Sequence, residues 1–250
     1  MLTRRPRFGV VVFPGTWSDR DCGWVIEAVL DCELVYLWHQ DCDLKECDCA
    51  ILPGGYCYGD YLRPGAIASL APIIAPIIRF SQSGGLVWGI CNGFQILCEA
   101  GLLPGALRRN QCGQFRCATT YLLVEDAETP YTSRLSRGSV VEIPISHGEG
   151  RYHADDATLA DLERRGQVVF RYATAAGDPC PQANPNGSVN NIAGIVNRAG
   201  NVLGMMPHPE RCAEEALGCS DGLWLFESVL NSIMGAGRAI TGGQQARGWA

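Results

Sequence analysis

Short apolar runs separated by amphipathic stretches organise the first hundred residues of the chain. The runs FGVVVF (8–13), ELVYLW (33–38), CAILP (49–53) and GLVWGI (85–90) have the length and continuous hydrophobicity of buried strands. Helical patterns lie between them. This alternation predicts a parallel sheet with helices on both faces.

Two of the intervening helices carry local start or stop signals. Ser18 is placed to cap a helix that extends to about Val29. The stretch 65–85 is apolar and helix-like, but Pro72 and Pro76 should break or kink it.

The second half of the chain has a different pattern. The turns NPNG (184–187) and NRAGN (197–201) are short, which suits antiparallel neighbours. Helices are predicted at 155–165 and 221–233. The predicted strands of this half are TTYLLVE (119–125), VVEIPI (140–145), QVVFRYA (167–173), NIAGIV (191–196) and NVLGMMP (201–207).

The two halves show no internal repeat and no linker between them. We therefore expect one α/β domain over residues 1–234, with a mixed, largely parallel central sheet flanked by helices and antiparallel additions in the second half. Residues 235–250 contain five glycines and little periodicity, and are predicted to form a flexible C-terminal tail.

Charge and apolar length exclude two classes of partner. The chain has 250 residues and a net charge of −6, which argues against a nucleic-acid surface. No apolar run is long enough to cross a membrane. The N-terminal run 8–13 ends in Pro14-Gly15, so it is interpreted as a strand and not as a signal peptide.

The 13 cysteines follow no regular framework, and their odd number fits a reducing, cytoplasmic location better than a disulfide scaffold. The densest group is His39, Cys42, Cys47 and Cys49. It lacks the paired C-x2-C spacing of structural zinc sites, so no metal is predicted.

Cys91 stands between Gly89 and Gly93, after a predicted strand and before a helix that should end near Gly101. A nucleophile at a sharp strand-to-helix bend needs small residues two positions to either side. The bend would expose the sulfur at a helix N-terminus, where the dipole favours the thiolate. The spacing alone fits a buried cysteine in a tight turn equally well.

His208 and Glu210 are candidates for the base and its orienting carboxylate. Pro207 and Pro209 bracket the histidine and favour extended backbone there. In extended chain residues i and i+2 point the same way, so Glu210 can hold the imidazole ring. Taken alone, this segment also fits an exposed polar turn.

The segment Pro53–Gly55 follows a third predicted strand. Its glycines would let backbone N–H groups approach a small substrate and stabilise an oxyanion. Alone it is only a turn signal. The three segments together supply a nucleophile, a base with its partner, and an oxyanion hole.

These three motifs resemble the signatures of the class I (triad) glutamine amidotransferases, which are P-G-G, G-x-C-x-G-x-Q and H-P-E. They stand here as PGG at 53–55, GICNGFQ at 89–95 and HPE at 208–210. Within that family the chain is similar, over residues 8–233, to the glutaminase subunits of phosphoribosylformylglycinamidine synthase. Strings such as LPGGYCYGDYLRPGAIA and GNVLGMMPHPER carry this similarity.

The resemblance implies a flavodoxin-like fold and a set of residue roles. Cys91, His208 and Glu210 would be catalytic, and the N–H groups of Gly55 and Asn92 would form the oxyanion hole. Gly54, Gln95 and His147 are expected to contribute to substrate binding, a hydrogen-bonding structural role being the alternative for His147. No metal is expected in the site.

The resemblance also implies partners. L-glutamine would be hydrolysed to glutamate and ammonia, and the ammonia would pass to a synthetase subunit, PurL. That subunit would use ATP and Mg²⁺ to convert formylglycinamide ribonucleotide into the amidine, with a small subunit, PurS, completing the assembly. No cofactor is expected in this chain.

Three further loops, and two positions that differ from the family pattern, bear on the structure of the pocket. The loops 58–63, 109–117 and 146–150 are expected to form pocket walls or docking faces. Cys57 stands where the family usually has a serine, which is expected to alter hydrogen bonding in the pocket. Trp17 stands where the family usually has an asparagine, in a loop that would order the active site.

Two other classes of protein fit parts of the pattern. The first is another cysteine-nucleophile α/β hydrolase or a DJ-1/PfpI-like protein. In α/β hydrolases the acid precedes the histidine in the chain, which is not the order here. The second is a non-catalytic regulatory subunit, against which the complete set of Cys91, His208 and Glu210 argues.

Overall fold

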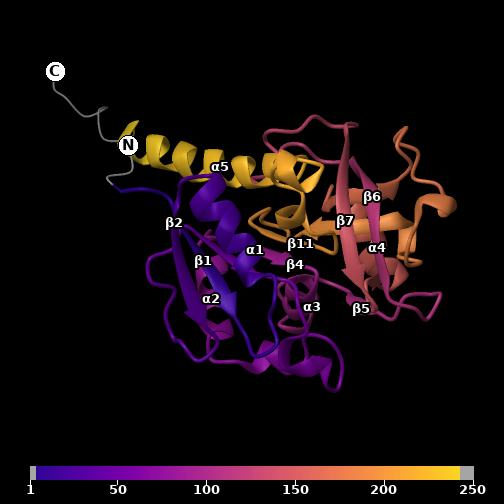
Figure 1. The fold of residues 1–250 in the computed structure, drawn as a ribbon, viewed down its shortest axis with the longest axis horizontal. Helices are drawn as coiled ribbons and strands as arrows, with labels where there is room; N and C mark the ends of the chain where they lie inside the picture. Colours follow the sequence, from indigo (N-terminus) through magenta and orange to yellow (C-terminus); the bar gives the residue numbers. More distant parts are fainter. Residues whose placement is uncertain (1–3, 243–250) are drawn as a thin grey trace.

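A nine-stranded mixed sheet runs through the part of the chain that the computed structural model describes, residues 4–242 (Figure 1). The strand order across it is β2-β1-β3-β4-β11-β10-β9-β6-β7. These strands are β1 (Arg7–Val12), β2 (Glu33–Trp38), β3 (Cys49–Leu52), β4 (Leu86–Ile90), β6 (Arg116–Val124), β7 (Val140–His147), β9 (Val168–Ala173), β10 (Ile192–Val196) and β11 (Val202–Met205).

The sheet changes from parallel to antiparallel at β11. Strands β2, β1, β3, β4 and β11 are parallel to their neighbours, and β11, β10, β9, β6 and β7 are antiparallel to theirs. The predicted mixed, largely parallel sheet with antiparallel additions is therefore confirmed. Strand β11 belongs to both parts, since it is parallel to β4 and antiparallel to β10.

Helices and a small ribbon complete the described chain. The antiparallel ribbon pairs β5 (Ala106–Arg108) with β8 (Arg151–His153). The longer helices are α1 (Asp19–Trp24), continued by the wider turn η1 (Val25–Val29), α2 (Ile74–Gln82), α3 (Asn92–Glu99), α4 (Asp156–Arg164) and α5 (Leu223–Gly242). The short helices are η2 (Cys57–Asp60), η3 (Ala68–Leu70), η4 (Pro181–Ala183), η5 (Val189–Asn191), η6 (Pro209–Arg211) and η7 (Glu215–Leu217).

Neighbouring residues of β4 show that helices cover both faces of the sheet. The Trp88 ring packs on Phe226 of α5, with ring centroids 4.8 Å apart. The next residue, Gly89, faces α3, because a Cβ there would lie 2.5 Å from the Leu97 side chain. Successive residues of a strand point to opposite faces, so α5 and α3 lie on opposite sides, as the sequence pattern predicts.

Pro72 breaks the stretch 65–85 as predicted, whereas Pro76 does not. Helix α2 begins at Ile74, after Pro72. Pro76 lies within its first turn, where a backbone N–H would lack an intrahelical partner in any case.

Ser18 stands at the start of α1, but its side chain does not cap the helix. Its hydroxyl instead accepts a hydrogen bond from the Arg211 guanidinium at 3.0 Å. The predicted capping is therefore wrong. The Ser18 hydroxyl bonds to Arg211, which is distant in the sequence, and not to the first N–H groups of the helix.

Helix α5 extends further than its apolar pattern indicated. It continues to Gly242, into the segment 235–250 that the sequence assigns to a tail. Burial of Leu225, Phe226 and Val229 fixes its first turns, and each further residue then adds one hydrogen bond to an existing helix. Residues 243–250 lie outside the described part of the chain.

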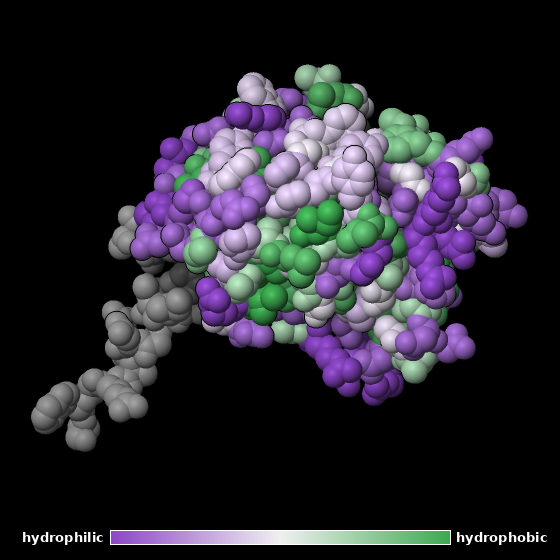
Figure 2. All heavy atoms as spheres, turned by 90° about the horizontal axis from the view of Figure 1, so that it is seen from below, coloured by the Kyte–Doolittle hydropathy of each residue, from purple (hydrophilic) through white to green (hydrophobic). Residues whose placement is uncertain are grey.

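Hydrophobic side chains are also found on the outside of the protein. Seen from below Figure 1, apolar residues gather near the middle of the face, among hydrophilic ones (Figure 2). The segment before α2 exposes Tyr61, Leu62 and Leu70 at 74%, 88% and 84%. Within residues 4–242, no helix has both the length and the apolar character that crossing a membrane requires.

Helix α3 approaches β3 so closely that only glycine fits at the contact. A Cβ on Gly93 would lie 1.8 Å from the carbonyl oxygen of Leu52. Because that oxygen belongs to the backbone of a central strand, it cannot move aside cheaply. The start of α3, and with it Cys91, is therefore positioned by backbone contact.

Replacing Gly93 with alanine should lower the free energy of unfolding by about 2 kcal/mol or more, since the methyl group overpacks this contact. Urea denaturation followed by circular dichroism measures the change. Gly235→Ala is the matched control, because a Cβ at that helical glycine meets nothing within 4 Å. It should raise stability by roughly 0.5–1 kcal/mol. Equal stabilities for Gly93→Ala and the wild type would contradict the packing argument.

Candidate active site

Cys91 occupies a strained bend between β4 and α3. Its backbone has φ 51° and ψ −105°, a conformation that costs a non-glycine residue about 1–3 kcal/mol. The flanking glycines permit it, since a Cβ on Gly89 would lie 2.7 Å from the Gly93 carbonyl. The sequence prediction of a tight strand-to-helix bend with obligatory glycines is confirmed.

His208 and Glu210 form a buried pair on the loop after β11. His208 Nδ1 and Glu210 Oε1 are 2.6 Å apart, and the two side chains are 1% and 0% exposed. The His208 N–H donates to the carbonyl of Pro144 in edge strand β7 at 2.8 Å, which fixes the loop. The structure thus brings the two side chains together as predicted, but Glu210 lies in the short helix η6 and not in extended chain.

The ring of His208 lies beside the nucleophile. A Cβ on Gly54 would be 2.6 Å from His208 Cε1 and 3.4 Å from Cys91 Cβ, so both side chains flank this glycine. His208 Nε2 is buried without a hydrogen-bond partner among the described residues. That nitrogen is available for proton exchange, and catalytic hydrogen bonds are often loose without substrate.

Two effects oppose each other in the pKa of His208. Burial alone would lower it, but the Glu210 carboxylate and a negatively charged Cys91 outweigh burial and raise the pKa to about 10. At neutral pH the ring therefore holds its proton and can deliver it to a leaving group.

The two residues expected to supply the oxyanion hole lie next to the cavity and to the nucleophile: Gly55 lines the cavity with Cys91, and Asn92 follows Cys91 in the chain. Gly55 has φ 149° and packs so tightly on the 15–17 backbone that a Cβ would lie 2.8 Å from Thr16 Cα. Asn92 is the first residue of α3. Among the described residues, neither the Gly55 N–H nor the Asn92 N–H donates to a protein acceptor, so both remain available to an oxyanion.

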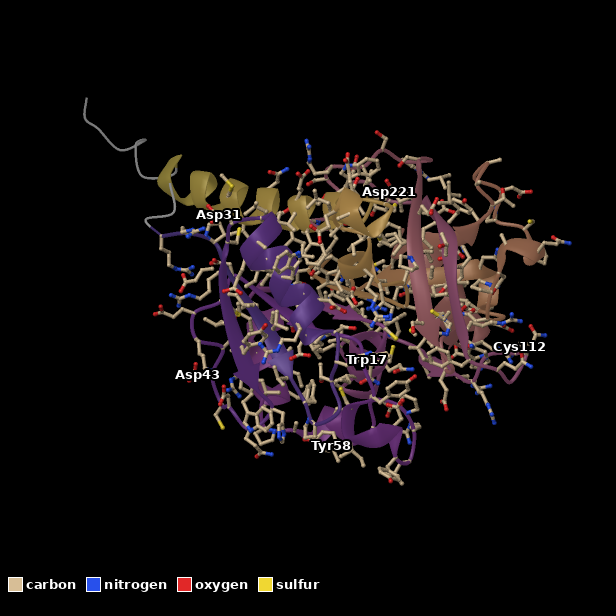
Figure 3. All side chains as sticks on the ribbon, in the orientation of Figure 1. Trp17, Asp31, Asp43, Tyr58, Cys112 and Asp221 are labelled. Carbon is tan, nitrogen blue, oxygen red and sulfur yellow. The ribbon has the colours of Figure 1, made fainter. Side chains whose placement is uncertain are left out.

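A small cavity of about 140 Å³ opens on Cys91. Gln95 also lines it, and its walls come from Asp60, Phe115 and residues 146–149. The three loops singled out in the sequence each contribute one wall. Figure 3 shows Trp17, another lining residue, between the N-terminal half of the sheet and the strands β6 and β7.

The expected pocket residues take different positions. Gly54 does not line the cavity, and instead makes room for the His208 ring. Gln95 lines it, but its amide is engaged: Nε2 donates to the Glu149 carbonyl at 2.7 Å and Oε1 accepts from Asn92 Nδ2 at 2.8 Å. Gln95 therefore ties the cavity wall to the residue after the nucleophile.

His147 lines the cavity while both ring nitrogens are occupied. Its Nδ1 lies 3.1 Å from Asn110 Oδ1, and its Nε2 lies 3.5 Å from Asn186 Nδ2. Asn110 Oδ1 also accepts from the Gly150 N–H, so Nδ1 is the donor and Nε2 the acceptor. Burial, and then the positive charge of His208, lower the pKa of His147 to about 4.

Tyr56 is a lining residue that the sequence did not indicate. Its only available signal was adjacency to the PGG turn. Cys57, one of the noted departures, is buried and lies 3.4 Å from the Thr16 hydroxyl, while its N–H donates to Asn92 Oδ1 at 3.1 Å. The thiol thus retains the polar contact that a serine hydroxyl could make.

The cysteine and histidine group of the sequence forms no metal centre in residues 4–242, where no His, Cys, Asp or Glu side chains gather in threes suited to an ion. His39 is instead buried against Tyr58, whose hydroxyl lies 2.7 Å from Nδ1.

Comparison with known proteins agrees with this geometry. A CobB/CobQ-like glutamine amidotransferase domain is recognised over residues 5–218. The PurQ subunit of phosphoribosylformylglycinamidine synthase from Moorella thermoacetica is 60% identical over 90% of this chain and 95% of its own length. This chain belongs to the PurQ family of glutamine amidotransferases.

Other members of the PurQ family give the same result. The subunit from Salinibacter ruber is 56% identical over 91% of this chain and 97% of its own. The structure of PurLQS from Thermotoga maritima contains a chain with 43% identity and a TM-score of 0.82, covering 92% of this chain and all 100% of that one. The rival assignments to other cysteine hydrolases are therefore not supported.

The charge balance at His208 predicts the effect of Glu210→Gln. Glutamine can still accept from Nδ1 but brings no charge, so burial will lower the pKa of His208. We expect kcat for glutamine to fall about 10- to 100-fold, less than the roughly 10²–10⁴-fold expected for His208→Gln. Steady-state kinetics at a series of pH values measure the change in kcat. The substitution Glu128→Gln, at an exposed position, is the control and should leave kcat unchanged. An unchanged kcat in Glu210→Gln would contradict the assignment.

The low pKa of His147 predicts acid sensitivity. Between about 4 and the ordinary 6.5, the unfolded chain binds a proton at this residue that the folded chain does not. Stability therefore falls as pH decreases through that window, by up to about 3 kcal/mol from this group. The wild type should lose more stability than His147→Gln between pH 6.5 and 4 in urea titrations, and parallel curves would refute the assignment.

Proposed function

We propose that this chain is the glutaminase subunit of phosphoribosylformylglycinamidine synthase, and that it hydrolyses L-glutamine to glutamate and ammonia. The observation that carries the proposal is the convergence on one small cavity of Cys91 at its strained bend and the buried His208–Glu210 pair. A nucleophile, a base and an orienting acid are the parts that amide hydrolysis through a covalent intermediate requires.

In the first half-reaction the Cys91 thiolate attacks the side-chain carboxamide carbon of glutamine. The carbonyl oxygen becomes an oxyanion, which the N–H groups of Gly55 and Asn92 stabilise. Collapse of the tetrahedral intermediate breaks the C–N bond. His208 gives its Nε2 proton to the leaving nitrogen, so ammonia departs and a thioester remains on Cys91.

In the second half-reaction His208 is neutral and acts as the base. Its Nε2 takes a proton from water, and the resulting hydroxide attacks the thioester carbon. The second tetrahedral intermediate releases glutamate and restores the thiolate and the imidazolium. Glu210 remains ionised throughout and holds the ring by its Nδ1 proton.

The ammonia passes to the synthetase subunit, PurL, in an assembly that includes PurS. There ATP and Mg²⁺ drive the conversion of formylglycinamide ribonucleotide into formylglycinamidine ribonucleotide, and this chain itself carries no cofactor. The names of the relatives and the PurLQS assembly support this role. Large apolar side chains at the cavity mouth, Trp17, Tyr56 and Phe115, are 42–52% exposed and suit a partner surface.

We place the assembly in the cytoplasm, where purine nucleotides are made. All 13 cysteines are free thiols, as a reducing compartment would keep them.

A diazo ketone analogue of glutamine, 6-diazo-5-oxo-L-norleucine, tests the nucleophile. Incubated with the full chain and its synthetase partners, it should modify Cys91 alone among the 13 cysteines, as read by peptide mass spectrometry. Modification should disappear in Cys91→Ala, together with glutamine hydrolysis. Cys57→Ser is the matched control, because that buried thiol lies close to the site but not in the cavity.

Labelling at another residue, or glutamine hydrolysis that survives in Cys91→Ala, would remove the proposal's foundation. The isolated chain should hydrolyse glutamine more slowly than the assembled complex, because partner contacts order the site. Equal rates would show that this chain needs no partner for activity.

A further inference from the structure

Two carboxylates, Asp60 and Glu149, line the same cavity as Cys91 and have no part in the mechanism above. Both side chains are partly exposed to the cavity. Neither makes an ion pair with any residue in 4–242, although ion pairs are common elsewhere on the protein surface. The site therefore holds two negative charges that its own side chains leave uncompensated.

Cations of the protein do not balance them, since the protonated ring of His208 is paired with Glu210. The cavity lining contains no lysine or arginine, and its histidine, His147, is neutral at pH 7 because burial lowers its pKa to about 4. The guanidinium of Arg211 lies 5.3 Å over the Trp17 ring at the mouth, but its nitrogens contact Ser18 and Asp21. A ligand must bring the missing positive charge.

The two carboxylates also repel each other electrostatically. Burial, followed by the charge of Glu149, raises the pKa of Asp60 to about 6, while a hydrogen bond from Asn92 acts in the opposite direction. Like charges held close together without a counterion destabilise the empty site, and a bound cation relieves that repulsion.

Both residues are bonded to the catalytic segment, Asp60 through its side chain and Glu149 through its backbone carbonyl. Asp60 Oδ1 accepts from Asn92 Nδ2 at 3.2 Å, and the Glu149 carbonyl accepts from Gln95 Nε2 at 2.7 Å. Asp60 also holds a backbone φ of 53°, which is unfavourable for aspartate and must be maintained by its surroundings. Both residues therefore belong to the hydrogen-bond network of Asn92 and Gln95, in the helix that follows Cys91.

We propose that Asp60 and Glu149 bind the α-ammonium group of the substrate and so restrict the site to amides that are also amino acids. This inference rests on the proposed function, since it assigns the other end of the glutamine whose carboxamide meets Cys91. Simple carboxamides lack the charge that the acid pair selects.

Two substrates that differ only at the α-carbon test this assignment. L-glutamine has the ammonium group, and glutaramate (5-amino-5-oxopentanoate) lacks it. Each is assayed with the full chain and its synthetase partners, in wild type, Asp60→Asn and Glu149→Gln. Both substitutions preserve shape, and the amide introduced by Asp60→Asn keeps an oxygen for the Asn92 hydrogen bond.

Each variant should lose about 10- to 100-fold in kcat/KM for L-glutamine, chiefly through KM, as expected for a charge-assisted contact worth roughly 1.4–2.8 kcal/mol. The value for glutaramate, already low in the wild type, should change less than twofold. The preference for glutamine therefore falls. Glu128→Gln, an exposed acid outside the cavity, is the control and should keep the wild-type preference.

Labelling of Cys91 separates a failure of this inference from a failure of the proposed function. Chloroacetamide, which has no charge, should alkylate Cys91 at wild-type rates in both variants, whereas the diazo amino acid should react more slowly. Slow reaction with both reagents would indicate a damaged nucleophile and overturn the inference. A wild-type glutamine preference in both variants would also overturn it, while leaving the glutaminase intact; a wild type inactive toward glutamine would overturn both.

Discussion

The contact between Gly93 and the Leu52 carbonyl is the constraint on which the site depends. Helix α3 can start directly after β4 only because its first turn rests against the backbone of β3, at a distance that excludes any side chain. At the bend that results, Cys91 takes a positive-φ conformation and borders the cavity. The strain at the nucleophile is thus maintained by packing between two regular elements.

The sheet topology then gathers the remaining parts. Strands β1, β3, β4 and β11 are parallel, so the loops that follow them meet at one edge, and these loops carry Trp17, Gly55, Cys91 and His208. The antiparallel half reaches the same edge, because β6 begins where β7 ends, at Arg116 and His147. Walls and catalytic groups therefore come from segments far apart in the chain.

Much of this arrangement could be predicted from sequence because it rests on local rules. Strand runs, the glycines around Cys91 and the two-residue spacing of His208 and Glu210 each express a short-range constraint. What depends on long-range contacts could not be predicted. The Ser18 hydroxyl accepts a hydrogen bond from Arg211, which is 193 residues away in the chain. Gly54 leaves space for the ring of His208, which lies in another loop. The sequence also does not show that Asp60 and Glu149, which are 89 residues apart, line the same cavity.

Burial separates the roles of the three acids near the cavity. The Glu210 side chain is wholly buried against an imidazole, so it can only tune and orient that ring. Asp60 and Glu149 face the cavity and retain access to solvent, so they can meet a ligand. The buried carboxylate of Glu210 is stabilised by the proton of His208. The carboxylates of Asp60 and Glu149, which face the cavity, are stabilised by a cation that the ligand brings. In both places a carboxylate needs a positive partner. Where the carboxylate is buried, that partner is the catalytic histidine, and where it faces the cavity, the partner is the ammonium group of the substrate.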